Sequence, residues 1–182
     1  KKTSLNESHA CKQPNDTPVY SYDFQAPLGE FGQVRESFYY YQPLHLFLKE
    51  FGADWAESRV AIPTEVEAGP FDLQVLKRSC RIKDDQGLLC VNNYVRNTET
   101  PDFQGQLSIQ WPHEEVVVPS RPITISRGAY FLWPVNWTLE KARLKYATAQ
   151  PLCRVERPLT YFFFQTAGIP IEYAFDSQTV KT

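Results

Sequence analysis

The acidic side chains are the first candidates for chemistry, because hydrolysis of a glycoside uses two carboxyl groups, one as acid and one as nucleophile or base. Glu114 and Glu115 are adjacent, so on a strand they point to opposite faces and cannot form such a pair. Glu65 and Glu67 share a face by spacing, but they lie in residues 63–70, a proline-flanked stretch that indicates an exposed connection. Neither pair is therefore predicted to be catalytic.

Other reactive patterns are missing from the sequence. The histidines lack the H-E-x-x-H spacing of a zinc-binding helix, and no glycine loop for phosphate is present. A G-x-S-x-G turn, which presents a serine nucleophile, does not occur either. We expect no catalytic residue, no cofactor and no metal site within this segment. The histidines are His9, His45 and His113.

The four cysteines, Cys11, Cys80, Cys90 and Cys153, are too widely spaced for paired zinc ligands. Cys80 and Cys90 lie symmetrically about Asp85 in a predicted hairpin. Two outcomes are open for them: a disulfide across the two strands, or two small buried thiols.

Aromatic residues give the better functional signal, because a sugar ring presents apolar C–H faces that pack on Tyr and Trp side chains. Tyr20, Tyr22 and Phe24 alternate onto one face of a predicted strand, where they are either a binding surface or core. Trp133, Trp137 and the run 161–164 are expected to be core.

Composition limits the protein classes. The chain has 182 residues and a formal net charge of −2, which removes the electrostatic basis for binding nucleic acid or an anionic membrane. No apolar run approaches the ~20 residues that span a bilayer. Aromatic residues make up 14% of the chain, and the 14 Pro exceed the 8 Gly. This mixture favours strands joined by turns over a helical bundle.

The positioning elements change along the chain. Residues 1–18 are expected to be an extended or disordered leader, and 19–24 a short strand that ends at a turn over 26–29. Apolar residues then recur at steps of three or four from Val34 to Phe51, which predicts a helix that kinks or breaks at Pro43. A lone strand and helix over 19–57 cannot bury both of their apolar sides by themselves.

From residue 58 the pattern predicts short strands about ten residues apart. They are expected to form an antiparallel β-sandwich or jelly-roll-like domain over 58–176, followed by a tail over 177–182. The expected strands are 59–62, 73–82, 88–94, 105–111, 115–118, 123–126, 130–134, 142–147, 152–157, 159–164 and 171–175.

Residues 21–30 read Ser-Tyr-Asp-Phe-Gln-Ala-Pro-Leu-Gly-Glu. This segment resembles the S-Y-D-[YF]-x-A-P-[LI]-x-E element of the family 35 glycoside hydrolases, the β-galactosidases. Further similar stretches match the β-rich domain that follows the barrel in a microbial and fungal branch of that family. They are residues 88–94, 101–103, 130–136, 144–153 and 168–176.

The resemblance implies that 19–57 is the last strand and helix of a catalytic (β/α)8 barrel and that 58–176 packs against and supports it. It also implies a retaining β-galactosidase whose two catalytic glutamates lie upstream, so this segment alone is expected to be inactive. Tyr22 and Phe24 correspond to the substrate-binding segment, although Phe24 lacks the hydroxyl that many relatives carry there. A galactoside or oligosaccharide would be the substrate, and the parent protein is expected to be extracellular or periplasmic.

Two alternatives differ from this assignment. The aromatic content and sandwich pattern also fit a stand-alone carbohydrate-binding module, and residues 58–176 taken alone fit a purely structural domain.

Overall fold

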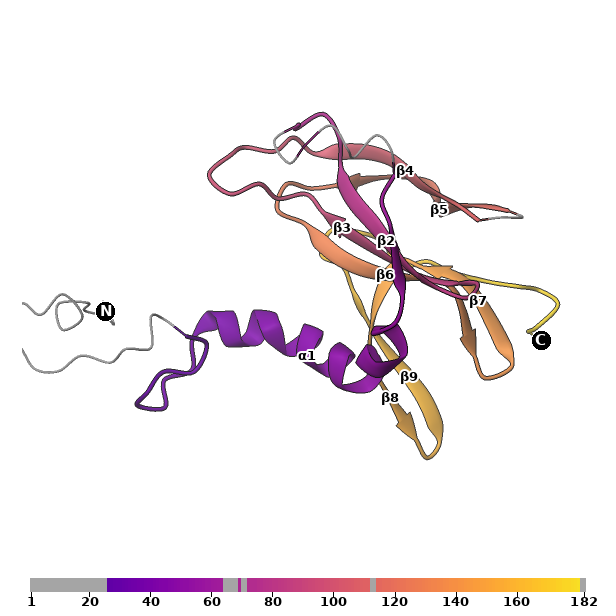
Figure 1. The fold of residues 1–182 in the computed structure, drawn as a ribbon, viewed down its shortest axis with the longest axis horizontal. Helices are drawn as coiled ribbons and strands as arrows, with labels where there is room; N and C mark the ends of the chain where they lie inside the picture. The colour runs from indigo at the N-terminus through magenta and orange to yellow at the C-terminus, as the bar shows by residue number, and fades with distance from the viewer. Residues whose placement is uncertain (1–25, 64–68, 70–71, 112–113, 181–182) are drawn as a thin grey trace, which may run out of the picture. The chain divides into compact units, whose positions relative to one another are not determined.

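The computed structural model describes residues 26–63, 69, 72–111 and 114–180. Within them the protein is mainly β, with antiparallel strands and one helix, as predicted (Figure 1). The predicted leader, the strand 19–24 and the candidate residues Tyr22 and Phe24 lie outside the described residues. The elements are α1 (Glu36–Trp55), β1 (Arg59–Ala61), β2 (Lys77–Lys83), β3 (Gln86–Asn92), β4 (Phe103–Gln110), β5 (Glu115–Ile125), β6 (Tyr130–Leu139), β7 (Ala142–Ala147), β8 (Ala149–Glu156), β9 (Leu159–Gln165) and β10 (Tyr173–Phe175).

The chain divides into two compact units, Lys1–Leu48 and Lys49–Thr182, and the division falls inside α1. In the first unit a tight turn precedes the helix: Leu28 and Val34 pair as an isolated bridge, and the Gly29 N–H donates to the Gln33 carbonyl at 2.8 Å. Gly32 has φ 79°, a left-handed conformation that glycine adopts without a steric penalty. The predicted turn over 26–29 thus extends to residue 33.

Helix α1 continues through Pro43, so of the two predicted outcomes the break is excluded, while the kink stays a prediction. Proline removes one backbone donor and crowds the preceding turn. The helix is 20 residues long, and the residues on both sides of Pro43 are helical. A single lost bond does not end a helix of this length.

Six strands form one antiparallel sheet in the order β1-β2-β3-β6-β7-β10, and the remaining strands form two ribbons, β4-β5 and β8-β9. Two hairpins of the large sheet close on two-residue turns. Lys83 pairs with Gln86 across the first, and Leu139 with Ala142 across the second. Asp84 and Glu140 have φ 53° in these turns.

The register of the first hairpin decides the cysteine question. Ser79 pairs with Cys90 and Cys80 pairs with Leu89, so the two cysteines are one position out of register. A shift of one residue places side chains on opposite faces of a sheet. Both thiols are free, and of the two alternatives the disulfide is excluded. Burial, and then the neighbouring Cys90, raises the pKa of Cys80 to about 12.

Strand β5 corrects the prediction of two short strands separated by a turn at 119–122. It is one strand of 11 residues, and it contains Pro119 and Pro122. Because β5 pairs only with β4, one of its edges needs no ladder donor there, which is where proline is tolerated in a sheet. The irregularity is taken up by the partner strand, whose register shifts between Gly105 and Leu107.

The core lies between the six-stranded sheet and the β4-β5 ribbon. Alternate residues of β6, Phe131, Trp133 and Val135, pack in one buried cluster with Leu107 and Val118 of the ribbon. Trp133 is fully buried and stacks on Phe131 at a ring-centroid distance of 4.0 Å. The expectation that Trp133 is core is therefore confirmed.

The run 161–164 is not core. Phe162 is 45% exposed and its neighbours in the run are half-buried. The run lies on β9, which pairs only with β8 in a two-stranded ribbon. A ribbon of two strands offers each aromatic side chain fewer covering neighbours than the central strands of a sheet do.

Candidate functional site

The last turns of α1 carry two aromatic side chains that pack on Trp137 of β6. The rings of Trp55 and Trp137 stack at 5.5 Å with an interplanar angle of 23°, and Phe51 is tilted against Trp137 at 5.5 Å. Phe51 and Trp55 are four residues apart, so they share one helix face. Each such aromatic pair contributes about 0.5–1.5 kcal/mol beyond its buried area. These contacts hold the end of α1, which belongs to the second unit, against β6.

Two polar contacts fix this aromatic cluster. The indole N–H of Trp137 donates to the carbonyl of Gly87 at 2.7 Å, and that bond is buried. Arg154 pairs with Glu50 at 2.7 Å, and its guanidinium lies 5.9 Å from the centre of the Phe51 ring. The ion pair joins β8 to α1 beside the stack, and both of its side chains are partly buried.

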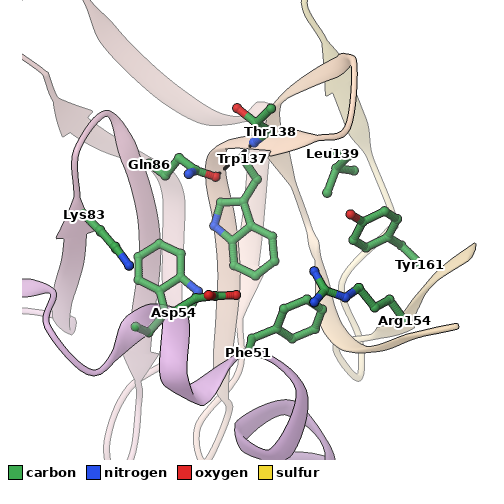
Figure 2. Close-up of a pocket in the computed structure, with 10 residues that line it drawn as sticks. Phe51, Asp54, Lys83, Gln86, Trp137, Thr138, Leu139, Arg154 and Tyr161 are labelled. Carbon is green, nitrogen blue, oxygen red and sulfur yellow. Dashed lines mark hydrogen bonds between the residues drawn. The ribbon is translucent and has the colours of Figure 1, made fainter. Parts of the chain in front are cut away.

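A pocket of about 280 Å3 opens beside the cluster. Figure 2 shows its side chains gathered around the Trp137 indole. Aromatic and aliphatic groups line it, and polar groups line it from the helix and from β2, β3, β6, β8 and β9. It is lined by Phe51, Asp54, Trp55, Lys83, Gln86, Trp137, Thr138, Leu139, Arg154 and Tyr161, all in the second unit.

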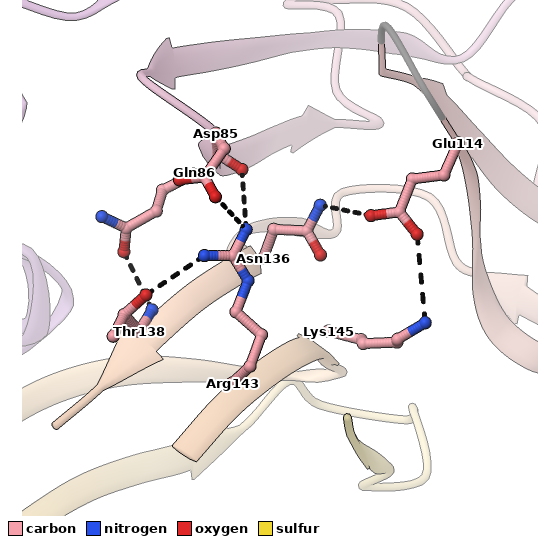
Figure 3. Close-up of polar contacts among 7 residues, drawn as sticks. All are labelled: Asp85, Gln86, Glu114, Asn136, Thr138, Arg143 and Lys145. Carbon is pink, nitrogen blue, oxygen red and sulfur yellow. Dashed lines mark hydrogen bonds and ion pairs between the residues drawn. The ribbon is translucent and has the colours of Figure 1, made fainter. Parts of the chain in front are cut away.

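A polar network holds the hairpin that brings Lys83 and Gln86 to the pocket (Figure 3). The Thr138 N–H donates to the side-chain carbonyl of Gln86 at 3.0 Å. Arg143 donates to the Asp85 carboxylate at 2.6 Å and to the Thr138 hydroxyl at 3.1 Å. These bonds tie the β2-β3 turn to β6 and β7, so the wall of the pocket is built from strands that are fixed to one another.

A second polar group lies around Glu172, just before β10. Ser120 donates its backbone N–H and its hydroxyl to this carboxylate at 3.0 and 2.9 Å, and the Tyr146 hydroxyl also donates to it. Burial, and then the bond to Glu172 and its charge, raises the pKa of Tyr146 to about 12. Partial burial opposes the charge on Glu172, but hydrogen bonds from Tyr146 and Ser120 and the nearby Arg121 lower its pKa. The group is a structural clamp between β5 and β7.

The residues weighed for catalysis do not come together. Glu114 contacts Asn136 at 3.1 Å and Lys145 at 3.9 Å, whereas Glu115 accepts a hydrogen bond from Ser108. His45 is exposed on α1 and stacks on Tyr41. Glu65, Glu67, His9 and His113 lie outside the described residues. Within the described part of the chain no cluster of His, Cys, Asp and Glu is arranged to hold a metal ion.

Sequence reasoning missed the pocket. Trp137 was expected in the core, and it is buried, but it contacts the helix end instead of joining the central cluster. The available signal was the spacing of Trp55, which continues the apolar stripe four residues beyond Phe51. The sequence does not show that this stripe packs on β6 and β8; only the structure does.

Comparison with known proteins adds no identification: no family model matches this sequence, and no curated protein does. In the described residues no helix is long and apolar enough to cross a membrane.

Proposed function

We propose that this chain is the non-catalytic part of a retaining β-galactosidase, comprising the end of the catalytic barrel and a β-domain that supports it. One observation carries the proposal: large apolar side chains over residues 28–48 are exposed. Their exposed fractions are Leu28 55%, Phe31 72%, Val34 50%, Tyr39 60%, Tyr40 58%, Tyr41 50%, Leu44 41%, Leu46 38% and Leu48 50%. Large apolar side chains exposed in this number are typical of a binding interface.

The barrel assignment explains why this surface exists. In a (β/α)8 barrel each helix packs on the strands and on neighbouring helices, so a helix and strand taken from its end expose the sides that those neighbours cover. The resemblance of residues 21–30 to the S-Y-D-F-x-A-P-L element supports this origin. The mainly β, antiparallel second unit supports the proposal of a β-rich domain after the barrel, which we propose to be jelly-roll-like.

Tyr22 and Phe24 are the proposed contacts to substrate. Active sites of these barrels lie at the carboxyl ends of the strands, and both residues belong to the segment that ends the proposed last strand. Tyr22 supplies a hydroxyl and an apolar ring to a galactoside. Phe24 supplies only the ring.

The test uses the reading frame that encodes this chain. We expect the sequence upstream to encode barrel strands carrying two glutamates. The extended protein should release nitrophenol from p-nitrophenyl-β-galactoside, and the 182-residue chain should not. Hydrolysis by the short chain, or an upstream sequence without a barrel, contradicts the proposal.

A second measurement tests the interface directly. Leu44→Glu and Leu48→Glu should raise the solubility of the short chain, because they remove exposed apolar surface, and should lower the melting temperature of the extended protein, because they bury a charge. Val155→Glu is the matched control, since Val155 is similarly exposed at 48% but lies on β8. Val155→Glu should not lower the melting temperature of the extended protein while raising the solubility of the short chain.

A further inference from the structure

We propose that the pocket beside Trp137 binds one neutral sugar ring, as a carbohydrate site in the β-domain that is separate from the barrel. Its aromatic lining is Phe51, Trp55 and Trp137 with the more open Tyr161, and polar side chains line the same pocket. A pyranose combines apolar C–H faces with a rim of hydroxyls, so it needs both kinds of surface at once. The site needs no barrel residue.

The charges that line the pocket are balanced. Asp54 is exposed at the pocket and Lys83 also lines it, so their opposite charges leave no net charge to favour an anion or a cation. Arg154 is already compensated by Glu50 at 2.7 Å, so it adds little net charge. Aromatic rings can bind a quaternary ammonium group, but the Lys83 ammonium offsets the attraction of Asp54 for such a ligand, and the buried rings offer it little open face. A neutral, hydroxyl-rich ligand remains.

The hydrogen-bonding groups of the pocket suit hydroxyls, which both donate and accept. The side-chain carbonyl of Gln86 is occupied by the Thr138 N–H, and this orients the amide so that its NH2 remains available. Lys83 has no ion-pair partner in the described part of the chain, so its ammonium is a second donor. Asp54 supplies an acceptor. Two donors and a carboxylate thus line one pocket, and a hydroxyl can pair with either kind of group.

The size of the pocket limits the ligand and its affinity. A volume of about 280 Å3 is at the lower end of small-molecule sites and suits one ring. The three buried rings expose only 4–8% of their surface, so the ligand contacts their edges and gains little from stacking. A dissociation constant on the order of millimolar follows for a single ring with few buried contacts.

The test is titration of the whole 182-residue chain, labelled with 15N, with methyl-β-galactoside, methyl-β-glucoside and arabinose. The indole N–H signals provide an internal comparison, since Trp55 and Trp137 line the pocket whereas Trp111 and Trp133 lie in the core. Saturable shifts at Trp55 and Trp137, with Trp111 and Trp133 unchanged, are expected for at least one sugar. Absence of saturation by all three sugars overturns the inference.

Paired substitutions locate the binding. Asp54→Asn replaces a charged acceptor by a weaker neutral one and Lys83→Ala removes a donor, so each should weaken binding about fivefold or more. Glu57→Gln and Lys141→Ala are their matched controls: both residues are exposed, and neither lines the pocket. Equal weakening by the controls, or binding that survives both pocket variants, places the sugar elsewhere and refutes the site.

Two further ligands test the charge argument. Inorganic phosphate and tetramethylammonium should leave the Trp55 and Trp137 signals unchanged at concentrations at which the sugar saturates them. If either ion binds there and the sugars do not, the proposed ligand class is wrong. These titrations use the short chain only, so their failure leaves the barrel proposal standing, and an upstream sequence without a barrel leaves the sugar site standing.

Discussion

Replacing Trp137 by phenylalanine should separate the indole hydrogen bond from the aromatic packing that holds the helix end. The phenyl ring keeps contact with Phe51 and Trp55 but cannot donate to the buried carbonyl of Gly87, a bond of 2.7 Å. A buried acceptor left without a partner costs about 1–3 kcal/mol. The smaller ring leaves a gap that costs about 1–2 kcal/mol more. We expect a loss of about 3 kcal/mol in the free energy of unfolding.

The matched control is Trp111→Phe. Trp111 is also buried, yet its indole nitrogen has no hydrogen-bond partner among residues 26–63, 69, 72–111 and 114–180. The same substitution there creates a similar gap and removes a donor that had no such partner. It should therefore cost about 1–2 kcal/mol less than Trp137→Phe. Equal losses for the two variants refute the argument from the hydrogen bond.

Urea unfolding followed by circular dichroism gives both free energies, and a loss of about 3 kcal/mol corresponds to a fall of roughly 10 °C in melting temperature for a unit of this size. Amide hydrogen exchange shows where the loss falls. In Trp137→Phe, residues 50–55 should lose protection before β3 and β6 do, because the helix end depends on this cluster while the central strands do not. Unchanged protection at 50–55 contradicts the assigned role of Trp137.

Three further predictions concern the β-domain. Glu172→Gln should destabilise the protein at pH 7. The difference in stability from wild type should shrink as the pH falls below about 4.5, because a carboxyl with a lowered folded pKa loses its contribution to stability when it is protonated. Melting curves across pH 3–8 measure this difference, and a difference that stays constant refutes the prediction. Gly87→Ala should lower the free energy of unfolding by about 1–3 kcal/mol, since the added Cβ would lie 2.7 Å from a core indole carbon. At Gly128 the added Cβ meets only open space, so the loss in Gly128→Ala should come from backbone strain alone. Cys80, whose pKa is about 12, should react with iodoacetamide at pH 8 far more slowly than the half-buried Cys153, and mass spectrometry should find no disulfide among Cys80, Cys90 and Cys153.

Much of the β-domain could be predicted because strand period and turn residues are local signals. Residues 142–147 were predicted as a strand with the observed bounds, and the turn after Lys83 falls in the hairpin predicted about Asp85. The errors arose where tertiary pairing decides. Prolines in β5 indicate a turn by themselves, but a strand with one unpaired edge accommodates them.

The candidate site was less predictable for a related reason. The symmetric positions of Cys80 and Cys90 about Asp85 suggested that they face each other. The observed turn is one residue shorter, and this places the two side chains on opposite faces of the sheet. The pocket depends on bringing α1, β2, β6 and β8 together, and no sequence spacing records that Arg154 lies beside Glu50. Sequence patterns therefore predict many of the buried residues and turns. They do not predict which polar side chains meet in the pocket, because that depends on the three-dimensional arrangement.

The exposed side chains over 28–48 also set the energy available to a partner. Covering the exposed half of a large apolar side chain contributes roughly 1 kcal/mol, so covering the whole set contributes on the order of 5–10 kcal/mol. A separate partner would first have to offset an association cost of similar size. A barrel in the same chain avoids most of that cost, because the connection keeps the two surfaces at a high effective concentration. The apolar surface is thus better suited to a covalently linked barrel than to a freely diffusing protein, and adding an isolated barrel in trans should restore far less activity than the continuous chain has.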